Sequence, residues 1–153
     1  MSANKILPWI LILFIAFVFL QSLFFKFSGS EETVIIFNTI GDWMAGIGVL
    51  SWAAEPFKTY GGLGVGLVEL FAVFLLFIPK TRAWGALIAL VVMSGAIFFH
   101  LGTPLGVDRV IDGDGNTDGG VLFFMACGVW VCAAITLFLN RHRLFGRPDT
   151  ASA

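Results

Sequence analysis

Four long stretches of apolar residues with almost no charge constrain this chain more than any other feature. They cover residues 6–25, 61–78, 83–102 and 121–139. Each is long enough for a helix to cross a hydrocarbon layer of about 30 Å, where every backbone polar group needs a partner within the chain. The chain is 58% hydrophobic and only 12% charged, whereas soluble domains carry about 25% charged residues. The 153 residues are therefore predicted to form one all-α domain, an integral membrane four-helix bundle.

The first stretch stands where a secretory signal peptide would stand. Its apolar run over residues 6–25 is longer than the 7–15 residues, roughly, of a signal-peptide core, and no small-x-small cleavage pattern follows it. We therefore expect this segment to be retained as the first span.

The basic residues predict how the bundle is oriented. Six of them lie in the three segments that share one side of a four-span protein: Lys5, Lys80, Arg82, Arg141, Arg143 and Arg147. The opposite side receives most of the acidic residues. Because Lys and Arg collect in cytoplasmic segments, both termini are expected in the cytoplasm and the protein in the plasma (inner) membrane.

A fifth apolar segment, residues 33–54, could raise the number of membrane spans to five. If it crossed the membrane, Lys80 and Arg82 would face outward, against the positive-inside tendency. Its larger apolar residues recur at spacings of four and three: Ile36, Ile40, Trp43, Ile47 and Leu50. This periodicity is typical of an amphipathic helix. We expect an extracytoplasmic interfacial helix over residues 33–54, between the first and second spans.

Glu69 is the most informative polar residue, because a carboxylate inside a span is costly unless it is paired or protonated. It lies about 12 Å from the outer end of the predicted second span, at 1.5 Å per residue. Gly62, Gly66 and Glu69 share one helical face by their spacing, and small residues at such spacing favour close helix contact. Glu69 is therefore predicted to face another helix.

Three further polar residues stand near the same outer side, namely Gln21 and Lys26 late in the first span and His100 at the end of the third. We predict a polar cluster or binding site of Glu69, His100, Lys26 and Gln21, in which Lys26 neutralises the carboxylate and the imidazole is a third titratable group. A structural alternative stays open for Lys26 and His100, because such residues at helix ends often only reach toward water.

The loop "VDRVIDGDGNTDGG" before the fourth span contains the pattern D-x-[DN]-x-[DN]-G, the first half of a calcium loop. The candidate Ca²⁺ ligands are Asp112, Asp114, Asn116 and Asp118. The twelfth position is Met125 in place of the required glutamate. A solvated turn built from Gly and Asp is the alternative, and the pattern favours it.

Beyond these patterns, residues 66–101 resemble the DoxX family of small four-span membrane proteins. The likeness consists of Glu69 early in the second span, a basic turn with Thr81 and Arg82, an Ala-rich third span and a terminal His100. Lys26 after an apolar first span also fits the family's layout, whereas the aspartate-rich loop does not. The resemblance implies a subunit or membrane anchor associated with quinone-linked redox systems.

The leading functional hypothesis is an accessory or anchoring subunit of such an assembly, with a quinone head group at the polar cluster. Two alternatives remain: a proton-coupled transporter subunit that uses Glu69, and a structural subunit whose acidic outer loop docks a partner or calcium.

The sequence holds no complete catalytic constellation, which favours a non-catalytic chain. Its net charge of −1 gives no basic patch for nucleic acid. The expected partners are the lipid bilayer and other membrane subunits.

Overall fold

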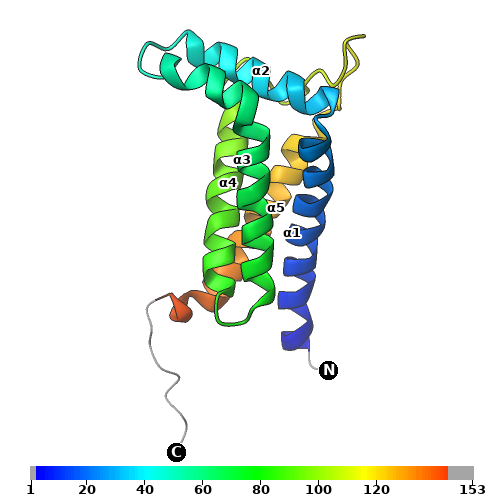
Figure 1. The fold of residues 1–153 in the computed structure, drawn as a ribbon. Coiled ribbons are helices and arrows are strands. Elements are labelled where there is room, and N and C mark those ends of the chain that lie inside the picture. Colours follow the sequence, from blue (N-terminus) through cyan, green and yellow to red (C-terminus); the bar gives the residue numbers. More distant parts are fainter. Residues whose placement is uncertain (1–2, 145–153) are drawn as a thin grey trace, which may run out of the picture.

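A computed structural model describes the backbone of residues 3–144 and the side chains of residues 6–142 and 144. Its helices are α1 (Ala3–Ser28), α2 (Glu31–Ala45), α3 (Ser51–Phe77), α4 (Arg82–Gly102) and α5 (Val121–Asn140), followed by the 3-10 turn η1 (Arg141–Arg143). Within the described range, four helices are long and apolar enough to cross a membrane: α1, α3, α4 and α5. Figure 1 shows these four as a bundle with α2 across one end. The predicted four-helix membrane bundle is confirmed.

The two ends of the bundle differ in composition. We use the name cap for α2, the first turns of α3 and the loop over residues 103–120, which lie together at one end (Figure 1). The ends of the described chain lie at the other end, together with the turn between α3 and α4 and its exposed Lys80. The side chains of Lys5 and Arg143, and all of Arg147, lie outside the described residues.

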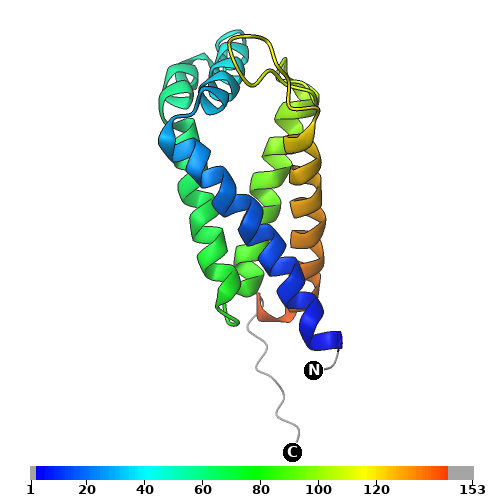
Figure 2. The ribbon, with the colours of Figure 1, turned by 90° about the vertical axis from the view of Figure 1, so that its right-hand side faces the viewer.

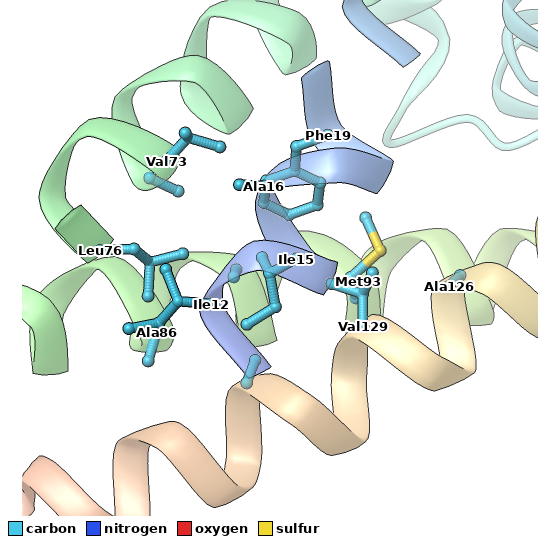
Figure 3. Close-up of a cluster of buried hydrophobic side chains, with 13 residues drawn as sticks. Ile12, Ile15, Ala16, Phe19, Val73, Leu76, Ala86, Met93, Ala126 and Val129 are labelled. Atoms are coloured by element: carbon cyan, nitrogen blue, oxygen red, sulfur yellow. The ribbon is translucent and has the colours of Figure 1, made fainter. Parts of the chain in front are cut away.

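The core of the bundle is built largely from small and branched apolar side chains (Figure 3). Ile12, Ile15 and Phe19 of α1 are at most 1% exposed and meet Leu76 of α3 and Val129 of α5. Buried alanines complete the contacts: Ala16, Ala72, Ala86, Ala89, Ala126 and Ala133. Small residues let helix backbones approach closely, and close packing holds helices together where lipid is as apolar as the core.

One contact between α3 and α4 leaves no room for a side chain. A Cβ placed on Gly85 would lie 2.8 Å from the carbonyl oxygen of Ala72 and 2.8 Å from the amide nitrogen of Leu76. Both atoms belong to the backbone and cannot move aside as a side chain can. Glycine at this position therefore sets the separation of α3 and α4.

The predicted helix over residues 33–54 is wrong in its bounds. The structure has α2 over Glu31–Ala45, a turn over residues 46–50, and α3 from Ser51, ten residues before the predicted start of the second span. Gly46 and Gly48 fall within this turn, where their low helix propensity is consistent with the end of α2. Ser30 begins α2 by accepting a hydrogen bond from the Thr33 amide at 3.3 Å.

The apolar face predicted for residues 33–54 nevertheless packs into a core. Ile40 and Met44 of α2 are buried with Ala54 of α3 and Leu105 of the loop, and the partly buried Ile36, Trp43 and Leu50 pack against them. The chain reverses between α2 and α3, so the two helices pack against each other at the cap. This second, smaller core fixes the cap on the bundle.

Candidate functional site

The carboxylate of Glu69 meets the ammonium of Lys26, as the sequence predicted. Lys26 Nζ lies 2.5 Å from Glu69 Oε2, and the Glu69 side chain is only 3% exposed. Lys26 also donates to Ser22 Oγ at 3.1 Å, and the Ser22 hydroxyl lies 2.9 Å from the same Glu69 oxygen. The charge of Glu69 is thereby balanced by the Lys26 cation, and the Ser22 hydroxyl donates a hydrogen bond to the same carboxylate. A buried pair of this kind is costly to break on one side only.

The glycines on α3 explain how Glu69 reaches α1. Gly66 packs against the side chains of Leu23 and Phe27 of α1, and Gly62 packs against Thr33 and Phe37 of α2. With no Cβ in the way, α3 lies close to both helices, and Glu69 comes level with the last turn but one of α1. The shared face of Gly62, Gly66 and Glu69 is confirmed, since all three are buried.

His100 lies on a different wall of the bundle and does not join the ion pair. Its Nδ1 is 2.6 Å from the carbonyl oxygen of Gly106, and its ring packs edge-on against Phe123 of α5. A carbonyl oxygen only accepts, so Nδ1 carries the proton in this hydrogen bond. The predicted contact of the imidazole with Glu69 and Lys26 is not formed, because α4 presents His100 toward α5 and the loop.

A cavity lies between the Lys26–Glu69 ion pair and His100. It has a volume of about 550 Å³ and lies between the cap and the bundle core. Its lining comes from all five helices and the loop, and most of it is apolar. The polar residues that line it are Gln21, Ser22, Lys26, Glu32, Thr33, Glu69, His100 and Asp118. All four residues of the predicted polar cluster therefore line one cavity, although among these four only Lys26 and Glu69 form an ion pair with each other.

Figure 2 makes the arrangement visible. At the cap end, α1 and α3 lie on one side and α4 and α5 on the other, and the two pairs diverge from the core toward the cap. The ion pair joins α1 to α3, and the His100 contacts join α4 to α5 and the loop. The cavity therefore separates two polar walls, and the polar contacts of each wall join elements on the same side of the cavity.

The four candidate calcium ligands do not form a metal site in the structure. Among the described residues, no group of three or more His, Cys, Asp or Glu side chains is placed to hold a metal ion. The carboxylate of Asp112 instead accepts hydrogen bonds from the amides of Asp114 and Asn116, both at 3.0 Å, and from Asn116 Nδ2 at 2.7 Å. These oxygens hold the turn together. The alternative of a Gly- and Asp-rich turn describes the loop, and the calcium hypothesis finds no support.

Asp118 has a structural role at the start of α5. Its carboxylate accepts from the amides of Gly120 at 2.9 Å and Leu122 at 3.1 Å. Partial burial by itself would raise the pKa of Asp118, but these two amides and the Arg109 charge together hold that pKa below its usual value. Gly119 and Gly120, with φ of 63° and 80°, permit the turn that brings the amides to the carboxylate.

Arg109 is a buried residue of the cap that was not among the site residues predicted from the sequence. Its side chain is 1% exposed and forms an ion pair with Glu32 of α2, while its Nε lies 3.5 Å from Asp118 Oδ2. Within the described residues its Nε and Nη1 have no hydrogen-bond partner. One cation among several aspartates of the same loop favours an ion pair within the loop, but nothing in the sequence indicated Glu32 of α2 as a partner.

Comparisons with known protein families, with curated proteins and with solved structures found no match to this chain. The DoxX resemblance thus stays a prediction from the residues that carry it.

Proposed function

We propose that this chain is a DoxX-like accessory subunit of a quinone-linked membrane redox assembly, and that its cavity receives the quinone head group. One observation carries the proposal: an apolar cavity of about 550 Å³ lies inside a membrane bundle, with an ion pair on one wall and an imidazole on another. Sites for small organic ligands commonly measure about 300–1,000 Å³ and combine apolar walls with a few polar groups.

The cavity also suits a ligand that arrives from the bilayer. Val91 of α4 and Val121 of α5 line it and are 63% and 59% exposed. Exposed residues on the flanks of a membrane bundle face lipid. A lipid-soluble ligand can therefore enter sideways, with its apolar tail along the flank and its head group inside.

The polar walls supply hydrogen bonds for the head group. An ammonium group has three N–H donors, and Lys26 uses two of them on Glu69 and Ser22. The third is free to donate to a carbonyl oxygen of a ligand. The ion pair thus supports a quinone-binding role in addition to its structural one.

The orientation is part of the same proposal. The described basic side chains at the end opposite the cap are Lys80, Arg82 and Arg141, which favours that end as the cytoplasmic one in the plasma (inner) membrane. A cysteine at Asn116, exposed in the loop, should react with a membrane-impermeant thiol reagent in intact cells or spheroplasts. Reaction only after lysis would reverse the orientation.

Quinone retention tests the main proposal. The chain is purified in a mild detergent after exposure to decylubiquinone, and the ligand that stays bound is extracted and quantified. Gly95 lines the cavity, and a Cβ there meets nothing within 4 Å, so Gly95→Phe should fill the cavity and remove most of the bound quinone. Gly64 has equally open surroundings but does not line the cavity, so Gly64→Phe is the matched control. No retention by the wild type, or equal retention by both variants, would overturn the proposal.

A further inference from the structure

One ring nitrogen of His100 is already engaged in a hydrogen bond, and this limits what the other nitrogen can bind. Nδ1–H donates to the carbonyl oxygen of Gly106 at 2.6 Å. No carboxylate among the described residues forms an ion pair with the ring. A neutral imidazole that carries its proton on Nδ1 presents a lone pair at Nε2, and that atom can only accept a hydrogen bond.

The Nε2 atom of His100 is not fully buried. His100 is 8% exposed and lines the cavity. Among the described residues, the fully buried side-chain nitrogens and oxygens that lack a partner are Nε and Nη1 of Arg109. Nε2 of His100 likewise has no hydrogen-bond partner within the described part of the chain, yet it is absent from that pair, so it keeps accessible surface on a residue that lines the cavity.

We infer that His100 selects the reduced form of the ligand, so that the cavity binds a quinol in preference to the corresponding quinone. This inference rests on the proposed function. The two oxygens of a quinone only accept hydrogen bonds, and one of them placed at Nε2 would set two lone pairs against each other. A quinol hydroxyl donates to Nε2 instead. On the opposite wall, the third N–H of Lys26 can serve either form, because both quinone and quinol oxygens accept.

The size of the effect follows from the cost of an unsatisfied polar group. A buried acceptor without a donor weakens binding by a factor of roughly five to a hundred. We expect the full-length chain in nanodiscs to retain decylubiquinol at least about fivefold more tightly than decylubiquinone under anaerobic conditions. Binding is measured as ligand retained above that of protein-free nanodiscs.

Two substitutions separate selection from a structural role of His100. His100→Phe keeps a ring against Phe123 but removes the acceptor, so it should weaken quinol binding and leave quinone binding nearly unchanged. His100→Gln can turn either its carbonyl or its amide toward the ligand, and should bind both forms with little preference. A His100 that only anchors Gly106 would instead weaken both forms equally when replaced.

The possible outcomes distinguish a failure of this inference from a failure of the proposed function. If neither form binds, the proposed function fails. If both bind but the wild type shows no quinol preference, or prefers the quinone, the selection by His100 is wrong and the proposed function stands. n-Decanol, which offers a hydroxyl without a ring, is the control for a general alcohol site, and retention equal to that of decylubiquinol would overturn the assignment to a quinol.

Discussion

The buried guanidinium of Arg109 joins the loop between α4 and α5 to the first turn of α2 through an ion pair with Glu32. Glu31, the neighbouring residue, accepts a hydrogen bond from the Gly113 amide of the same loop at 2.7 Å. These contacts between α2 and the loop over residues 103–120 hold the cap closed over the cavity, although the contacting residues lie about 80 positions apart in the sequence.

Arg109→Met should loosen the cap. The substitution leaves Glu32 and Asp118, which flank the guanidinium, without a cation between them. Because Glu32 is 27% exposed, the expected loss is discounted from that of a fully buried pair to about 1–3 kcal/mol of unfolding free energy. Thermal unfolding in detergent measures the loss, and hydrogen exchange should rise first in residues 103–120.

Lys58→Met is the control for Arg109→Met. Lys58 pairs with Asp42 at 2.7 Å and Glu55 at 2.8 Å, but those partners are 72% and 78% exposed. Exposed pairs contribute little to stability, and methionine keeps the apolar stem that packs on Gly41. A loss for Arg109→Met no greater than that for Lys58→Met would contradict the structural role of Arg109.

Lys26 and Glu69 should be energetically coupled. Lys26→Met leaves a buried carboxylate unpaired and Glu69→Gln leaves a largely buried ammonium unpaired, so each should destabilise the bundle by about 1–3 kcal/mol. The double variant should lose less than the sum of the single losses. Unfolding of all four proteins in the same detergent gives the coupling energy, and strict additivity would show that the contact is not a stabilising pair.

Gly85→Ala should destabilise the contact between α3 and α4. The added methyl would meet backbone atoms of Ala72 and Leu76 at 2.8 Å, and forced separation of packed elements costs about 1–3 kcal/mol. Gly95→Ala in the same helix meets nothing within 4 Å and should be neutral or stabilising by up to about 1 kcal/mol. Equal unfolding temperatures for the two variants would refute the close approach.

Acid should weaken the cap. The pKa of Asp118 is lowered in the folded chain, so its contribution is complete above the unfolded value of about 3.9 and is lost as pH falls through the lower, folded pKa. The Asn116 side chain and backbone likewise lower the pKa of Asp112. Stability measured from pH 6 downward should therefore decline below about pH 4.

Asp118→Asn tests the source of this acid sensitivity. It should reduce stability at neutral pH and flatten the decline below about pH 4. Asp114→Asn is the control, because the Asp114 carboxylate accepts no hydrogen bond within the described residues. An acid profile of Asp118→Asn that matches the wild type would assign the sensitivity to other groups.

Several features followed from the sequence alone. The lengths of the apolar stretches, together with the amphipathic periodicity of residues 33–54, predicted four spans, because a bilayer of given thickness requires helices that long and that apolar. The intramembrane carboxylate required a partner, and Lys26 was the cation at the matching depth. Both inferences depend on local quantities, namely residue type, run length and distance from a helix end.

Only the tertiary structure decided the rest. His100 had the right depth for the ion pair, but the rotation of α4 turned it toward Gly106 and Phe123. Arg109 lies in a loop rich in Gly and Asp, and it is buried because that loop folds back on α2. The cavity likewise exists because two helix pairs diverge beneath the cap. Such features depend on helix rotation and on contacts between distant segments, which residue order and periodicity do not encode.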